Sequence, residues 1–354
     1  MKVLILTGRF GMGHIKCACA LKEVISKNAQ VEVVDLVEYL FPRMSGLIYS
    51  GFGILVTKMS GMYNLLNKMA GKMGGVPLRK TAVRRIDNLL MEHNPDLVIS
   101  DLPLCSQYFS SYKEMRECSV PLYTYVTDIT FHNEWVAENT DLYFAGDVST
   151  RDAIISAGVP AGNVRISGIP VSESFHSREK KGERKNILVM GGGLGLVPSR
   201  ILYELSKVED ADVVLVAGHN RKLYDEVRGK FSNIKVYGYT DEIPELMADA
   251  DLLISKPGGI TMFEAIRSKT PLYIVKPELE QEIGNAGFIE RTGIGKVIYS
   301  MDEFSSDKIV SLLKDEEEMQ KMRENMNRVE EAFDDVNPLI YFKGERLCRK
   351  NMYI

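Results

Sequence analysis

The sequence predicts an α/β protein built from two doubly wound parallel sheets that face a cleft. Two patterns predict this class. Apolar runs of strand length alternate with Gly-rich turns and helical patterns along the whole chain. From residue 186, the second half opens as the first half does, with a buried strand followed by a Gly-rich turn. The length of 354 residues suits two domains of ordinary size.

The composition sets the class of protein. A hydrophobic content of 45% and a charged content of 26% are typical of a soluble globular chain. The net charge of −4 argues against general nucleic-acid binding. The five cysteines form no Cys-x-x-Cys pair, so neither a disulfide framework nor a zinc site is indicated, and a reducing cytosol is expected. The N-terminal apolar run is too short for a signal peptide.

The first unit has the order strand, turn, helix, strand, over residues 2–6, 7–14, 15 to about 27, and 31–35. Asp35 ends the second strand about where a dinucleotide-binding protein places its ribose-binding acid. The glycine spacing is wrong for such a site, because Lys16 stands where the third glycine would be. We therefore do not expect NAD binding.

His14 closes this first turn and is expected on the first helical turn. There its imidazole would face the crevice at the carboxyl ends of the strands. An imidazole so placed could accept a proton from an attacking hydroxyl near neutral pH. The alternative is a helix-start histidine that hydrogen-bonds its own loop.

Residues 39–86 contain no Asp or Glu and eight basic residues, which leaves −12 for the rest of the chain. The same segment is rich in Met, Leu, Ile, Phe and Tyr, and its apolar run 46–56 is too short to span a bilayer. A basic segment with apolar and aromatic side chains suits the surface of an anionic membrane. The alternative is a pair of amphipathic helices with solvated basic faces. The basic residues are Arg43, Lys58, Lys68, Lys72, Arg79, Lys80, Arg84 and Arg85.

The rest of the first half is expected as a helix from Arg84, strand 95–100, strand 121–127, strand 141–145, helix 151–157 and a closing segment 164–170. The segment after strand 121–127 carries Asp128, His132 and Trp135, the only tryptophan of the chain. Asp128 is a candidate base or an orienter of His14, and the alternative is an Asp that caps a turn. No residues cluster as metal ligands, because the two Asp-Ala-Asp triplets read as turns.

A polar, charged stretch at 171–185 is expected to link the domains. The second half then gives strand 186–190, strand 213–217, strand 234–236 and helix 243–248, and a helix is expected to begin at Pro198. The turn after the first of these strands places backbone close to a diphosphate. The glycines of that turn are Gly191, Gly192 and Gly193, and the next two turns carry Gly218, Asn220 and Tyr239.

Residues 252–285 are the most informative stretch. Strand 252–254, a turn at Lys256 to Gly259 and a helical pattern form an anion site, suited to a phosphate. Glu264, one helical turn in, is placed to accept hydrogen bonds from ribose hydroxyls. The alternative is a capping box made by Thr261 and Glu264. Gln281, Glu282 and Asn285 suit sugar hydroxyls, although a solvated helix start is the simpler interpretation of residues 280–282.

These motifs resemble a known family. Lys256-Pro-Gly258-Gly259-Ile-Thr261 with Glu264-Ala, then Gln281-Glu282 and Gly-Asn285, is similar to the donor-nucleotide motif of the diacylglycerol glycosyltransferases. That family includes the processive glucosyltransferases of bacteria and the plant monogalactosyldiacylglycerol synthases, and more distantly the N-acetylglucosaminyltransferase that makes lipid II. Gly13-His14 and the Asp128, His132 and Trp135 spacing also resemble it. One departure is Ser172, which stands where many members have a basic residue after Gly-x-Pro.

The resemblance covers nearly the whole chain and implies the GT-B fold. It implies inverting, metal-independent transfer of a hexose, with glucose favoured, from a UDP-sugar to diacylglycerol or glycosyl-diacylglycerol. His14 would be the base, with Asp128 as a second candidate, and Gly13, His132 and Trp135 would serve the acceptor or the membrane. The UDP-sugar is a substrate, and no cofactor is implied.

The implied domains are an acceptor domain at 1–170, the linker 171–185, a nucleotide-sugar domain at 186–337, and a helix at 338–354 that packs back on the first domain. The expected place is the cytoplasmic face of the membrane, without a spanning segment. Alternatives are a transferase with a polyprenyl-linked acceptor, a UDP-sugar epimerase or hydrolase, and a UDP-sugar sensor. The choice between glucose and galactose, the number of sugars and the oligomeric state stay open.

Overall fold

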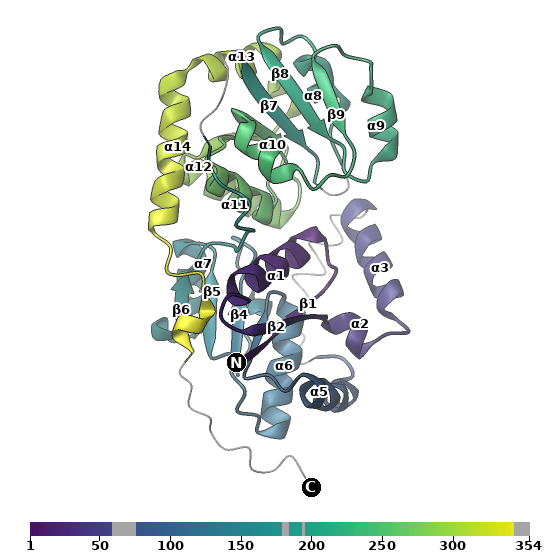
Figure 1. Ribbon diagram of the computed structural model, residues 1–354, viewed down its shortest axis with the longest axis vertical. Helices are drawn as coiled ribbons and strands as arrows, with labels where there is room; N and C mark the ends of the chain where they lie inside the picture. The colour runs from purple at the N-terminus through teal and green to yellow at the C-terminus, as the bar shows by residue number, and fades with distance from the viewer. Residues whose placement is uncertain (59–75, 179–183, 193–194, 343–354) are drawn as a thin grey trace. The chain divides into compact units, whose positions relative to one another are not determined.

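The computed structural model describes residues 1–58, 76–178, 184–192 and 195–342, and the chain forms two compact units (Figure 1). Of the described residues, unit 1 contains those in Met1–Thr127, Phe131–Pro170 and 334–342. Unit 2 contains Asp128–Thr130 and the described residues of Val171–Phe333.

Unit 1 holds a six-stranded parallel sheet in the order β2-β1-β3-β4-β5-β6. The direction of the strand order reverses between β1 and β3, which pair from Val3 with Leu97 to Leu6 with Ser100. Its strands are β1 Lys2–Thr7, β2 Gln30–Asp35, β3 Leu97–Ser100, β4 Leu122–Tyr125, β5 Leu142–Ala145 and β6 Val164–Ile166. Its helices are α1 Met12–Ile25, α2 Leu36–Leu40, α3 Ser45–Lys58, α5 Arg79–His93, α6 Pro103–Arg116 and α7 Val148–Ser156.

Unit 2 holds a second six-stranded parallel sheet in the order β12-β11-β10-β7-β8-β9. Its order reverses between β7 and β10, as in the doubly wound nucleotide-binding sheets. Its strands are β7 Lys185–Met190, β8 Ala211–Val216, β9 Ile234–Tyr237, β10 Leu252–Ser255, β11 Leu272–Val275 and β12 Gly295–Ile298. Its helices are α8 Ser199–Leu205, α9 Arg221–Val227, α10 Ile243–Asp249, α11 Gly259–Ser268, α12 Glu280–Thr292, α13 Ser306–Lys314 and α14 Glu316–Glu331.

The apolar runs become central strands because both faces of each sheet are covered. All four residues of β3, β4, β5, β10 and β11 are buried. A parallel strand with helices on both faces has no polar face, so its sequence shows a continuous apolar run rather than an alternation. The predicted fold class, with two parallel sheets of the doubly wound kind, is confirmed.

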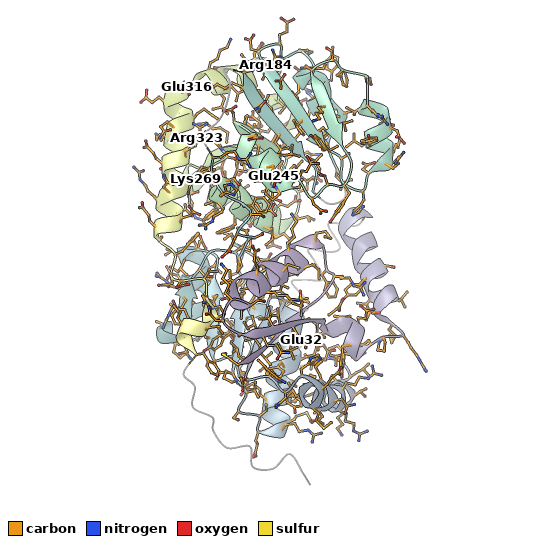
Figure 2. The ribbon with its side chains drawn as sticks, in the orientation of Figure 1. Glu32, Arg184, Glu245, Lys269, Glu316 and Arg323 are labelled. Carbon is orange, nitrogen blue, oxygen red and sulfur yellow. The ribbon has the colours of Figure 1, made fainter. Side chains whose placement is uncertain are left out.

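Helix α14 packs on the rest of unit 2 through one face that carries a row of methionines. Met319, Met322 and Met326 are buried, at the three- and four-residue spacing of one helix face. The helix lies beside α11 and α12 (Figure 1). Ion pairs fasten it at several points: Lys185 to Glu316 at 2.6 Å, Arg323 to Asp251 at 3.9 Å, and Lys269 to Glu330. Glu316, Arg323 and Lys269 are labelled in Figure 2.

Some boundaries differ from the sequence-based expectation. Pro198 is the N-cap of α8, with ψ of 134°, so the helix begins one residue later than expected. The chain rejoins unit 1 at Asp334, four residues before the expected boundary, and Asp334 N–H donates to the Ile166 carbonyl. Of the expected helix at 338–354, Pro338–Tyr341 form one 3₁₀ turn, and residues 343–354 lie outside the described residues.

Candidate active site

In unit 1 the Gly-rich turn after β1 leads directly into α1. Gly11 is the N-cap of the helix and has φ of 94°, a conformation that glycine adopts without steric cost. His14 therefore lies on the first turn of α1, as expected. The turn lies at the point where the strand order reverses, which is where open α/β sheets bind their ligands.

One hydrogen bond fixes the tautomer of His14. Its Nδ1 lies 2.8 Å from the backbone carbonyl oxygen of Asp101, and 3.3 Å from the hydroxyl of Thr127. A carbonyl oxygen only accepts, so Nδ1 carries the hydrogen and donates it. In the neutral ring the lone pair is then on Nε2, which is the nitrogen able to take a proton from another molecule.

Asp101, whose backbone carbonyl holds this histidine, also has a buried carboxyl group. It follows β3, and its side chain is 0% exposed. Burial raises the pKa of the Asp101 carboxyl well above its ordinary value, and the nearby Thr7 hydroxyl offsets only part of that effect. Asp101 was not among the residues predicted to belong to the site. The Asp at the end of a buried strand was the available signal.

The turn also contacts α3 through Tyr49. The Tyr49 hydroxyl donates to Asp35 Oδ1 at 2.5 Å, and its ring packs edge-on against Phe10 with centroids 5.1 Å apart. Arg9 lies over the same ring at 5.3 Å and donates to Asp35 Oδ2 at 2.9 Å. Burial and the Asp35 carboxylate raise the pKa of Tyr49, so its hydroxyl stays a donor. The Tyr49 side chain thus joins α3 to the turn that leads into the helix of His14.

In unit 2 a pocket of about 290 Å³ opens at the carboxyl ends of β7, β8, β10 and β11. Four segments of the chain line the pocket. They are residues 195–198, Asn220, Lys256, and the group Val275, Lys276 and Glu278. This is again the position where the strand order reverses. Of the predicted donor residues, Asn220 and Lys256 line the pocket, whereas Lys276 and Glu278 were missed. Their place just after a buried strand was the signal that could have found them.

The turn after β7 requires glycine because it folds onto itself. Leu196 N–H donates to the Gly191 carbonyl at 3.0 Å. A Cβ on Gly191 would lie 2.4 Å from the Leu196 nitrogen, and one on Gly195 would lie 1.9 Å from the Ala217 carbonyl oxygen. Gly192 has φ of 68°, and Gly193 lies outside the described residues. Asn220 closes the turn by donating its Nδ2 to the Gly195 carbonyl at 3.0 Å.

Helix α11, which follows β10, begins in a different way from the capping box that the sequence offered as an alternative. The N-cap of α11 is Gly258, and Thr261 lies inside the helix, so the capping box of Thr261 and Glu264 is not formed. Glu264 is buried, at 1% exposure. Asn285 is also buried, and its Nδ2 donates to the Pro257 carbonyl at 2.8 Å. Asn285 therefore holds the turn from Lys256 to Gly259 in place from α12.

Glu282 has a structural role at the start of α12. Its Oε2 accepts from the backbone N–H of Glu278 at 2.8 Å and of Leu279 at 3.2 Å. This capping arrangement supports the simpler interpretation of residues 280–282 as a helix start. Gln281, beside it, is half-buried. The predicted sugar contacts of Gln281 and Glu282 stay predictions.

The turns after β8 and β9 together present an aromatic pair. His219 and Tyr239 stack with their centroids 4.5 Å apart and their planes 18° apart, and Tyr239 is 57% exposed. Gly218 has φ of 56°, which fits the sharp turn after β8. A flat, exposed aromatic surface of this kind suits a planar base.

The expected acceptor role of Trp135 is wrong. The side chain is 0% exposed and packs in a core cluster with Val126, Tyr143 and Ile154. A fully buried indole contacts neither a lipid nor an acceptor. Trp135 follows β4 in a polar segment, and for this reason its burial was not predicted from the sequence. His132 and Gly13 are half-buried, and Asp128 is counted with unit 2.

The basic segment is only partly available to other molecules. Arg79 pairs with Glu114, and Arg85 Nη1 donates to the Tyr39 carbonyl at 3.1 Å. Arg43, Lys80 and Arg84 are exposed. Lys68, Lys72 and the side chain of Lys58 lie outside the described part of the chain.

Apolar side chains are exposed next to these cations. Leu47 is 75% exposed and Met44 is 50% exposed, close in sequence to Arg43, and Leu78 is 60% exposed beside Lys80. None of the helices in the described residues has both the length and the hydropathy needed to cross a membrane. In the same part of the chain, no three His, Cys, Asp or Glu side chains are grouped as metal ligands.

Comparison with known proteins matches both halves of the chain. Residues 14–171 match the family described as monogalactosyldiacylglycerol (MGDG) synthase, and residues 186–338 match the glycosyltransferase family 28 C-terminal domain. The processive diacylglycerol beta-glucosyltransferase of Staphylococcus carnosus is 26% identical over 381 positions, which cover 100% of this chain and 93% of that protein. The protein of the same name from Bacillus subtilis is 28% identical, over 92% of this chain and 90% of its own length.

The solved structures that share the fold include MurG and SpnG. MurG of Acinetobacter baumannii has a TM-score of 0.62 at 14% identity and covers 96% of this chain and 97% of its own. The spinosyn rhamnosyltransferase SpnG has a TM-score of 0.66 at 12% identity, over 96% and 99%. The family and fold expected from the motifs are therefore confirmed. This chain is a glycosyltransferase of the GT-B fold and belongs to the family that includes the monogalactosyldiacylglycerol synthases and the processive diacylglycerol glucosyltransferases.

Proposed function

We propose that this protein transfers a hexose from a UDP-sugar to diacylglycerol or to a glycosyl-diacylglycerol, with inversion at the anomeric carbon. Glucose is the favoured donor sugar, because the named relatives are glucosyltransferases. The observation that carries the proposal is the tautomer of His14. A histidine on a Gly-rich turn, with Nδ1–H held by a carbonyl, offers a basic Nε2 to an incoming hydroxyl.

The chemistry needs one proton transfer and one displacement. The acceptor hydroxyl gives its proton to His14 Nε2 as its oxygen attacks the anomeric carbon. The bond from that carbon to the β-phosphate oxygen breaks, and its electron pair leaves with UDP. Attack from the face opposite the leaving group inverts the anomeric centre. Asp128 remains the second candidate for the base.

We place the departing diphosphate at the unit 2 pocket, next to Lys256. Lys256 lines the pocket and supplies a cation, and in this proposal the turns that contain Gly191–Gly192 and Gly258–Gly259 supply backbone N–H groups. In this proposal Glu264 binds the ribose and Tyr239 lies near the uracil ring. No metal ligand set is invoked, because cationic side chains and N–H dipoles stabilise the leaving group.

We also propose that unit 1 binds the cytoplasmic face of an anionic membrane. Exposed cations next to exposed apolar side chains, as at Arg43 with Met44 and Leu47, support this location. A diacylglycerol acceptor resides in the bilayer, so the enzyme must reach it there. The same surface would serve a polyprenyl-linked acceptor.

The first experiment measures release of UDP and formation of glycolipid from UDP-glucose and UDP-galactose. The acceptor is diacylglycerol in anionic liposomes, with lipid-free detergent as the control. We expect lipid-dependent turnover by the wild type. His14→Ala should lower turnover by at least about 100-fold, the range for loss of a general base, with the Kd for UDP unchanged.

Two outcomes would contradict the proposal. UDP binding without any glycolipid would favour a UDP-sugar epimerase or sensor. Turnover retained in His14→Ala would exclude His14 as the base and would move the role to Asp128, which the same assay tests with Asp128→Asn.

A further inference from the structure

Three charged side chains meet on one wall of the unit 2 pocket: Lys256, Lys276 and Glu278. Glu278 Oε1 lies 2.8 Å from Lys276 Nζ, and its Oε2 lies 3.9 Å from Lys256 Nζ. Each carboxylate oxygen therefore faces a different lysine. Among the described residues that line this pocket, these are the charged ones. We propose that Lys276 is a second cationic ligand of the donor diphosphate and that Glu278 occupies the anion position until the diphosphate displaces it.

The backbone holds this cluster at the pocket. Lys276 has φ of 45°, a left-handed conformation that is strained for a non-glycine residue. Its N–H donates to the Ile298 carbonyl of β12 at 2.8 Å, which keeps the chain in that turn. The turn is what lets residues 276 and 278, which follow a buried strand, line the same pocket as Lys256 from the neighbouring strand β10.

The charges favour a Glu278 carboxylate that binds the two lysines in the absence of ligand and that a diphosphate can displace. Lys276, and less strongly Lys256, lower the pKa of Glu278, and Glu278 raises the pKa of Lys276. Glu278 and Lys276 are therefore both charged near neutral pH. The side chains of Lys276 and Glu278 are about half exposed, at 51% and 49%, so solvent screens their attraction. A diphosphate carries more charge and more acceptor oxygens than one carboxylate, so it gains more from the two lysines.

This inference rests on the proposed function, because it assumes that the pocket binds a nucleoside diphosphate. It extends that function in two ways. Leaving-group stabilisation would come from two cations rather than from Lys256 alone. Glu278 would weaken retention of the product UDP, since a negative charge beside the diphosphate opposes it.

The test measures Kd by calorimetric titration of the full chain with UDP and with uridine, which lacks phosphate. Lys276→Met should weaken UDP binding about 10-fold, the loss expected for one charge-assisted contact. Glu278→Gln should tighten UDP binding about threefold to tenfold by removing the competing charge. Neither change should alter uridine binding, because both act on phosphate.

A matched ion pair in the same unit provides the controls. Lys296 pairs with Glu318 at 2.5 Å, Lys296 is 49% exposed, and neither residue lines the pocket. Lys296→Met and Glu318→Gln make the same changes in net charge and should leave both affinities unchanged. The opposite signs expected for Lys276→Met and Glu278→Gln could not arise from a general loss of structure.

Three results would overturn the inference. UDP affinities equal to wild type in both pocket variants would refute it and leave the proposed function standing. Weaker UDP binding by Glu278→Gln would show that Glu278 supports binding instead of competing with it. A wild type that binds no UDP would refute both the inference and the proposed function.

Discussion

At the scale of single residues, the chemistry depends on hydrogen bonds between residues far apart in the sequence. His14 and Asp101 are separated by 87 residues, yet the Asp101 carbonyl decides which imidazole nitrogen is basic. The Asp101 carboxyl, on the same residue, lies in the core. A backbone carbonyl holds the ring without adding a charge beside it.

Asp101→Asn tests the state of this carboxyl through pH. Burial raises its pKa in the folded protein, so below about pH 4 the group is protonated in both the folded and unfolded states. As pH rises, the unfolded chain releases the proton while the folded chain keeps it, which favours unfolding of the wild type. Asparagine has no proton to release. We expect the melting temperature of Asp101→Asn, relative to wild type, to be higher at pH 8 than at pH 4.

Asp302→Asn, at an exposed aspartate, is the control and should show little such change. A relative melting temperature of Asp101→Asn that is the same at pH 4 and pH 8 would mean that the Asp101 carboxyl titrates normally.

At the scale of elements, α3 and the start of α5 carry exposed apolar side chains, Leu47 and Leu78. Tyr49 of α3 contacts Phe10 and Arg9 of the histidine turn and donates to Asp35 at the end of β2. Helix α3 is therefore in direct contact with the turn that leads into the helix of His14. Exposed cations flank the exposed apolar residues of these two elements.

Charge reversal of this surface tests the membrane proposal. The triple variant Arg43→Glu, Lys80→Glu and Arg84→Glu should bind anionic vesicles about 100-fold less tightly, since each basic residue near such a surface contributes about 1 kcal/mol. Binding is measured by vesicle sedimentation, with neutral vesicles as a reference. The control variant reverses three exposed lysines of unit 2, namely Lys222, Lys308 and Lys321. Equal loss in the two variants would show only an effect of net charge.

At the scale of the whole molecule, the chain divides its tasks between two units with separate cores. The histidine turn belongs to unit 1 and the pocket belongs to unit 2. Trp135 is part of the unit 1 core, where it contributes stability instead of the acceptor contact that the sequence analysis expected.

Trp135→Ala and UDP should act on different units. The substitution removes a fully buried indole and should destabilise unit 1 by about 3–5 kcal/mol. UDP at 100 times its Kd should stabilise unit 2 by about 2.7 kcal/mol. In calorimetry we expect the variant to lower one melting transition and UDP to raise the other. Trp135→Phe, which keeps an aromatic ring, should lower the first transition less. A single transition that both changes move would contradict this division.

The sequence by itself determined the two parallel sheets, the Gly-rich turns and the sites of His14 and Lys256. These are local properties: a covered parallel strand is apolar throughout, and a turn at its carboxyl end has a fixed place in a doubly wound sheet. Only the tertiary structure decided that the Asp101 carbonyl orients His14, that Lys276 and Glu278 join Lys256, and that Trp135 is buried. Those contacts depend on which strands become neighbours, and strand order is set by the packing of the whole sheet rather than by any local pattern.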